Sequence, residues 1–126
     1  MIRLLLIGLG GFAGAILRHV LGGLVQNRTP GSFPAGTLAV NLVGCLVIGA
    51  VVELVEGRGF LGPDGRSFLI VGVLGGFTTL SAFANETVNA MRDGDVGVAA
   101  LNVTATVALS LVAVYAGRAL THLVWR

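Results

Sequence analysis

The sequence alternates between long apolar segments and short polar ones. No charged side chain occurs within residues 33–52, 67–85 or 96–117, and the earlier apolar segment 2–25 is interrupted in its interior by Arg18. About 18 consecutive apolar residues suffice for a helix to cross the hydrocarbon core of a bilayer. We therefore predict four membrane-spanning helices, over about residues 2–25, 33–55, 67–90 and 95–122.

The composition agrees with this pattern. Of the 126 residues, 55% are hydrophobic and only 11% are charged. Soluble domains carry about 25% charged residues. These proportions indicate an all-α membrane protein with a single transmembrane domain, residues 1–126, embedded in a lipid bilayer. The net charge is only +2 and the basic residues are scattered along the chain, so we expect no nucleic-acid partner.

The arginines give a weak signal for orientation in the membrane. With four spans, both termini and the middle connection lie on one side. That side carries Arg3, Arg58, Arg66 and Arg126, whereas the other side carries Arg28 and Arg92. Arginines in short loops favour the cytoplasmic side, and the difference here is small. Such a weak bias permits insertion in both orientations.

The third span contains the segment GGFTTLSAF, residues 75–83, which is poor material for a continuous helix. Two adjacent glycines and three hydroxyl side chains weaken the helix near its middle. In lipid, a broken helix survives only where it is buried in protein or lines a cavity. Clustered backbone carbonyls at such a break bind small cations. The segment therefore indicates either an ion site made of backbone or a simple kink.

Polar side chains recur at every fourth residue on two of the spans. They are Thr37, Asn41 and Cys45 on the second span and Asn102, Thr106 and Ser110 on the fourth. Residues at this spacing share one face of a helix. Threonine and serine can bond to their own helix or join neighbouring helices. An asparagine amide cannot be satisfied on its own helix, so each stripe needs a partner, water or an ion.

Two charged residues and two glycine pairs also stand out. Arg18 lies about 24 Å along the first span, past the midplane, at 1.5 Å per residue. It either extends to the far interface or faces a watery vestibule that attracts anions. Glu86 lies at the end of the third span, near the interface. The pairs 10/14 and 72/76 have Gly-x-x-x-Gly spacing, which allows helices to pack closely.

Three motifs together resemble the Fluc/CrcB fluoride channel family. They are GGFTTLSAF followed by NET at 75–87, GTLAVNLVG at 36–44 and GGFAGAILRHVLG at 10–22, in the order and spacing of the family. The resemblance covers all four predicted helices. It implies a passive, fluoride-selective channel that exports cytoplasmic fluoride across the inner (plasma) membrane. It also implies an antiparallel homodimer of dual topology, with a structural sodium ion (Na+) at its centre.

The resemblance also assigns residues. It places the sodium ligands on the backbone carbonyls of Gly75 and Thr78. The implied ion pathway comprises Asn41, Phe83, Leu80, Thr37, Asn102, Thr106, Ser110 and Arg18, with Thr79, Ser81 and Glu86 in support. The family has phenylalanine where this chain has Leu80. A phenyl ring presents a positive edge to an anion, and leucine has none, so this position departs from the pattern.

Two other classes of membrane protein compete with this hypothesis. A small dual-topology drug–proton antiporter needs an acidic residue within its first span, where this chain has Arg18 instead. A non-transporting membrane subunit would need only the close helix packing that the glycines provide. The sequence shows no nucleophile–base pair, so we expect that the protein is not an enzyme.

Overall fold

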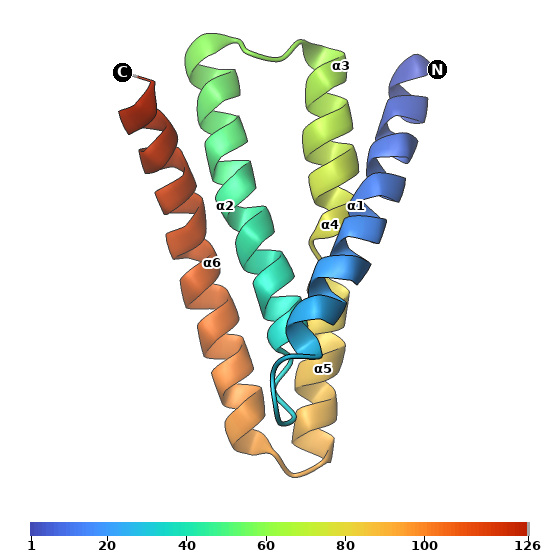
Figure 1. Cartoon of the computed structure of the whole chain (residues 1–126), viewed down its shortest axis with the longest axis vertical. Coiled ribbons are helices and arrows are strands. Elements are labelled where there is room, and N and C mark those ends of the chain that lie inside the picture. Colours follow the sequence, from blue (N-terminus) through green and yellow to red (C-terminus); the bar gives the residue numbers. More distant parts are fainter. Residues whose placement is uncertain (126) are drawn as a thin grey trace.

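The computed structural model describes residues 1–125 and contains four long helical spans (Figure 1). Arg126, one of the arginines counted for orientation in the membrane, lies outside the described residues. The first, second and fourth spans are single helices: α1 (Ile2–Gln26), α2 (Ala35–Arg58) and α6 (Val96–Val124). The third span consists of α3 (Pro63–Arg66), η1 (Ser67–Leu74), α4 (Gly75–Phe77) and α5 (Leu80–Arg92).

All four spans are long and apolar enough to cross a membrane. Their most apolar 18-residue windows have mean hydropathies of 1.8, 2.4, 1.8 and 2.0. The observed boundaries differ from the predicted ones by only a few residues at each end. The prediction of an all-helical, multi-pass membrane protein with a broken third span is therefore confirmed.

Local capping explains where α2 begins and ends. The Gln26 side-chain amide, at the end of α1, donates to Phe33 O at 3.1 Å, and its Oε1 accepts from Gly36 N at 3.0 Å. Gln26 thereby satisfies an amide of the first turn of α2, which would otherwise lack an intrahelical partner. At the other end, Gly59 adopts the left-handed conformation (φ 61°), and its amide donates to Val55 O at 3.0 Å. Glycine favours this helix ending because it has no Cβ.

The spans form two pairs that meet at one end of the molecule. α1 packs along η1 and α4, whereas α2 packs along α6. Figure 1 shows the two pairs diverging toward the end that holds both termini and the 59–62 connection. Below the break, α5 packs against α6 instead of α1. The two halves of the third span therefore belong to different helix pairs.

Glycines allow the backbones of the two helices in each pair to come into direct contact. A Cβ added to Gly10 would lie 2.9 Å from the Gly72 Cα, and one added to Gly76 would lie 2.6 Å from Gly11 O. At the α2–α6 contact, a Cβ on Gly117 would meet Leu46 O. Backbones at this separation leave no room for side chains. The prediction that the two Gly-x-x-x-Gly pairs mediate close packing is confirmed, and they pack on each other.

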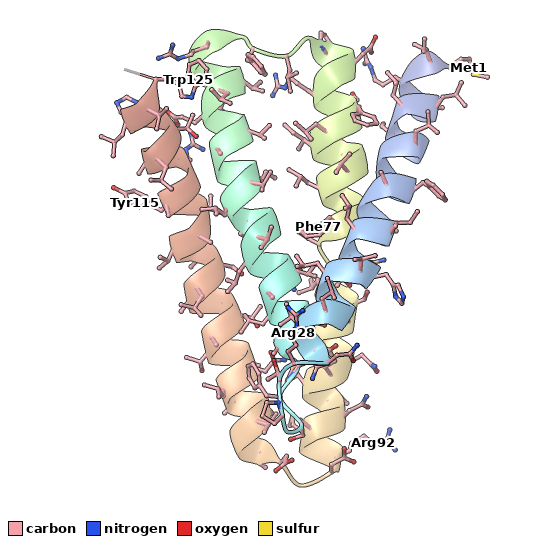
Figure 2. The ribbon with its side chains drawn as sticks, in the orientation of Figure 1. Met1, Arg28, Phe77, Arg92, Tyr115 and Trp125 are labelled. Carbon is pink, nitrogen blue, oxygen red and sulfur yellow. The ribbon has the colours of Figure 1, made fainter. Side chains whose placement is uncertain are left out.

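The small core lies where the helix pairs meet. Val40, Leu74 and Phe77 are buried there, and Figure 2 shows Phe77 between the two arms while Tyr115 points outward from α6. Residues Ser67–Leu74 form a π-helix, the helix type in which amides bond to carbonyls five residues earlier, as Gly75 N does to Ile70 O. This element was not predicted, because its residues carry no signal that distinguishes it from an α-helix.

We expect Gly14→Ala to destabilise the fold. The added Cβ would meet Val73 O and lie 2.9 Å from Phe77 N, both of them backbone atoms that cannot rotate away. Overpacking of this kind costs about 1–3 kcal/mol in the free energy of unfolding. Thermal unfolding in detergent micelles measures the effect. Gly8→Ala is the matched control, because nothing lies within 4 Å of its added Cβ. Equal stability of the two variants would contradict the packing described here.

Candidate functional site: the break in the third span

The helix break lies at Thr78 and Thr79, within the segment predicted to break. Both residues are extended, with φ/ψ of −81°/155° and −150°/112°. The Asn41 side chain of α2 pairs with the interrupted backbone: its Oδ1 accepts from Thr79 N at 2.9 Å and its Nδ2 donates to Thr79 O at 3.2 Å. Asn41 is 8% exposed. A buried amide therefore satisfies both backbone groups of one residue in the break.

The break also leaves backbone carbonyls without their helical donors, among them those of Gly75 and Thr78. In a continuous helix, each carbonyl accepts from the amide four residues later. For Gly75 O that donor is Thr79 N, which bonds to Asn41 instead. For Thr78 O the donor is Ala82 N, which bonds to Thr79 Oγ1 at 3.2 Å. These are the two carbonyls that the resemblance assigned to sodium.

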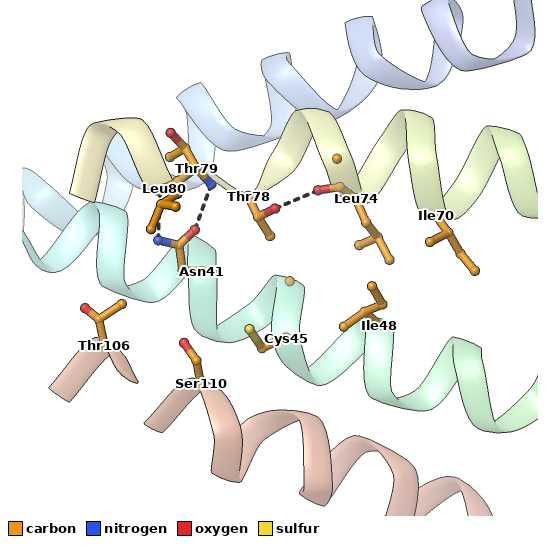
Figure 3. Close-up of a pocket in the computed structure, with 12 residues that line it drawn as sticks. Asn41, Cys45, Ile48, Ile70, Leu74, Thr78, Thr79, Leu80, Thr106 and Ser110 are labelled. Atoms are coloured by element: carbon orange, nitrogen blue, oxygen red, sulfur yellow. Dashed lines mark hydrogen bonds between the residues drawn. The ribbon is translucent and has the colours of Figure 1, made fainter. Parts of the chain in front are cut away.

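A groove of about 360 Å³ opens beside the break. Figure 3 shows its walls, which come from α2, the two halves of the third span and α6. We call it the central groove; its residues labelled in Figure 3 are Asn41, Cys45, Ile48, Ile70, Leu74, Thr78, Thr79, Leu80, Thr106 and Ser110. Most of the surface is apolar, and the polar groups gather at the level of the break. Gly75 is exposed on this face.

A second cavity, of about 300 Å³, adjoins the groove and brings together five of the predicted pathway residues. We call it the Phe83 cavity. Its lining includes Asn41, Leu80, Phe83, Thr106 and Ser110, from α2, α5 and α6. Four of the six polar residues predicted to form stripes on α2 and α6 therefore line one space: Asn41, Cys45, Thr106 and Ser110. Leu80 is 77% exposed and lies at the start of α5.

Four of the other predicted polar residues line a third cavity of about 270 Å³, the Arg18 cavity. Arg18, Thr37, Thr79 and Glu86 line it. Thr37 Oγ1 donates to Glu86 Oε1 at 2.6 Å, while Glu86 Oε2 is buried without a hydrogen-bond partner in the described part of the chain. Arg18 is half-buried here. Thr79 lines both this cavity and the central groove, so one residue of the break contributes to the walls of both spaces.

Two residues that were predicted to belong to the site, Ser81 and Asn102, line none of the three cavities. Ser81 is exposed, and its hydroxyl lies 3.3 Å from Thr79 Oγ1. Asn102 is 2% exposed and lines none of the three cavities; its Nδ2 donates to Thr87 Oγ1 at 2.9 Å. Thr87 was not identified from the sequence. Its position four residues after Phe83 was the available signal, because a threonine hydroxyl can reach the carbonyl four residues earlier.

The family comparison matches residues 5–118 to the model described as CrcB-like protein, Camphor Resistance (CrcB). The chain belongs to the CrcB family. The match covers all four spans of this CrcB-family protein, including the broken third span. The resemblance that the three motifs indicated is therefore confirmed.

Several named relatives are similar to this CrcB-family protein over most of its length. It is 49% identical over 115 residues to the Fluoride-specific ion channel FluC of Opitutus terrae, covering 90% of this chain and 87% of the relative. It is 42% identical over 118 residues to Fluoride-specific ion channel FluC 3 of Methanosarcina barkeri, covering 94% and 89%. Agrobacterium fabrum has a Fluoride-specific ion channel FluC that is 42% identical over 120 residues, covering 95% and 96%. These names describe channels and not enzymes.

Proposed function

We propose that the chain is the subunit of a passive, fluoride-selective channel that exports cytoplasmic fluoride across the inner (plasma) membrane and so limits its toxicity. One observation carries the proposal. At membrane depth, beside a broken helix, the Asn41 amide, two hydroxyls and the Phe83 ring surround a single cavity. The relatives are named as fluoride channels, so we assign the same ion to this cavity.

The donors suit a small anion. Fluoride is strongly hydrated, so a pore must replace its water with hydrogen-bond donors. Asn41 uses one of its two N–H groups on Thr79 O, which leaves the second for an ion. Ser110 lines the same cavity and can offer its hydroxyl, whereas the Thr106 hydroxyl donates to Asn102 Oδ1 at 3.3 Å. Neutral donors hold an anion less tightly than a buried arginine would, which permits conduction.

The Arg18 cavity would be the entrance to this path. Arg18 adds positive charge there, and the Thr37 hydroxyl is held by Glu86. We propose that fluoride moves from this cavity past Thr79 to the Phe83 cavity. Phe83 would offer the positive edge of its ring. Leu80 offers no such edge, so Phe83 would act without the second phenyl group that the family pattern includes.

A second copy of the chain would complete the channel. Irregular backbone at membrane depth must be buried in protein or line a cavity. In the single chain, Gly75 is exposed at the break and Leu80 is 77% exposed beside it. A homodimer that covers the central groove would remove both from lipid. We propose an inverted second subunit, because the weak arginine bias permits insertion in both orientations.

The residues at the break fit a structural sodium ion. Gly75 and Thr78 both line the central groove that the second copy would cover, and their freed carbonyls, a pair from each subunit, would give four oxygen ligands. Carbonyl oxygens at broken membrane helices are suitable sodium ligands. When bound, the ion would supply positive charge near the fluoride path.

The channel proposal predicts fluoride release from liposomes that contain only this protein. After addition of a potassium ionophore, a fluoride electrode should record fast release, and a chloride electrode should record none that matches it. No release above protein-free liposomes, from folded and dimeric protein, would contradict the proposal and favour a non-transporting subunit. Flux that requires a proton gradient and carries an organic cation would instead indicate an antiporter.

Substitutions at the cavity should change this flux. We expect Phe83→Ala and Asn41→Asp each to lower fluoride flux at least about tenfold, equivalent to about 1.4 kcal/mol in the barrier. The first removes the ring edge, and the second replaces a donor by a charge that repels anions. Leu80→Phe should preserve or raise flux. Phe12→Ala is the matched control, because Phe12 on α1 is 69% exposed. Near-wild-type flux in both test variants would refute the residue assignments.

Sodium removal should weaken the dimer. We expect crosslinking and sizing in detergent to show a dimer in sodium chloride, and less dimer with lower thermal stability in N-methylglucamine chloride. The reason is that the uncompensated carbonyls of two subunits would repel each other without the ion. Monomers in both salts would exclude the homodimer. A dimer equally stable in both would exclude the sodium site and leave the channel proposal standing.

A further inference from the structure

Phe83 is tied to the neighbouring helix through a chain of hydrogen bonds. Thr87 Oγ1 donates to Phe83 O at 2.8 Å, one turn back along α5. The same oxygen accepts from Asn102 Nδ2 of α6 at 2.9 Å. Asn102 Oδ1 in turn accepts from Thr106 Oγ1 at 3.3 Å. Each hydroxyl in this chain uses its only proton toward the next group, so the donors run in one direction, from Thr106 to the Phe83 carbonyl.

We propose that Asn102 and Thr87 are positioning residues that fix the Phe83 ring across the cavity from Thr106. The inference rests on the proposed channel function, because it assigns these residues to the geometry of the same path. Neither residue would touch the ion. Asn102 is 2% exposed, and neither it nor Thr87 lines the Phe83 cavity, whereas Phe83 and Thr106 do.

A comparison within the chain shows why Thr87 differs from an ordinary helix threonine. Thr104 also donates to the carbonyl four residues earlier, Ala100 O, at the same 2.8 Å. Such bonds are common in membrane helices and slightly bend them. Thr104 is exposed, however, and no amide in the described chain donates to its hydroxyl. Of these two threonines, Thr87 alone converts the local bond into a connection between two helices.

Burial makes this connection specific. An asparagine amide that loses its partner in a buried site leaves an unsatisfied donor, which is costly. The turn of α5 that carries Phe83 is therefore held at one rotation and one distance relative to α6. Because this series of hydrogen bonds ends at Thr106, it holds the Phe83 and Thr106 walls of the Phe83 cavity at a fixed separation. A fixed separation favours one size of anion, so loss of these hydrogen bonds should lower both the fluoride flux and the fluoride/chloride selectivity.

Three variants test the proposal. Thr87→Val keeps the shape but removes the hydroxyl, Thr87→Ser restores it, and Thr104→Val removes the matched hydroxyl on the exposed face. We expect Thr87→Val to lower fluoride flux about tenfold and to reduce the fluoride/chloride ratio, as loss of one hydrogen bond of typical strength implies. Thr87→Ser should remain within about twofold of wild type, and Thr104→Val should be unchanged. If Thr87→Val does not fold, Asn102→Leu carries the same expectation.

A second readout does not depend on transport. With 4-fluorophenylalanine in place of Phe83, the fluorine NMR signal reports the environment of the ring. Thr87→Val should shift or broaden this signal, whereas Thr104→Val should not. An unchanged signal together with wild-type flux in Thr87→Val would overturn the proposal. If the wild-type protein released no fluoride, the channel function would fail, while the fluorine signal would still decide whether the ring is positioned.

Discussion

The bond between the Asn41 side chain and the backbone of Thr79 is the constraint on which the rest of the structure depends. A helix interrupted inside a membrane leaves amides and carbonyls that lipid cannot satisfy. Asn41 satisfies the amide and the carbonyl of Thr79 at once, over 38 residues of sequence. Because Thr79 N bonds to Asn41, the Gly75 carbonyl loses its helical donor. The Thr78 carbonyl loses its donor because Ala82 N bonds to Thr79 Oγ1. Both bonds involve Thr79, so the stable break and the candidate ion site depend on the same residue.

The break also lets one span pack against two different neighbours. Its first half lies along α1, where glycine faces bring the backbones into contact, and its second half lies along α6. A straight helix could not follow both directions. The three cavities lie where these contacts change, so the same discontinuity that redirects the chain opens the space in which polar groups meet.

The sequence predicted the features that depend on local composition. Three charge-free segments and one apolar segment interrupted by Arg18 predicted the four spans, the run from Gly75 to Phe83 located the break, and the glycine pairs indicated close contacts. The sequence alone could not predict the contacts that depend on which helices pack against each other. The bond of Thr37 to Glu86 joins residues 49 positions apart, and the partner of Asn102 is on another helix. The π-helix at Ser67–Leu74 has no compositional signal, because its residues would suit an α-helix equally well.

The pairing of α1 with η1, and of α2 with α6, has a consequence for biosynthesis. As the chain emerges from the ribosome, the first two spans enter the bilayer before either of their main packing partners has been made. The glycine face around Gly10 and Gly14 has no packing partner until the third span has been inserted. Gly49 of the second span likewise contacts Val114 only after the fourth span has been inserted. The packing of α2 against α6 therefore forms only after the last span has been made, and a chain that stops before the fourth span leaves the second without its principal neighbour.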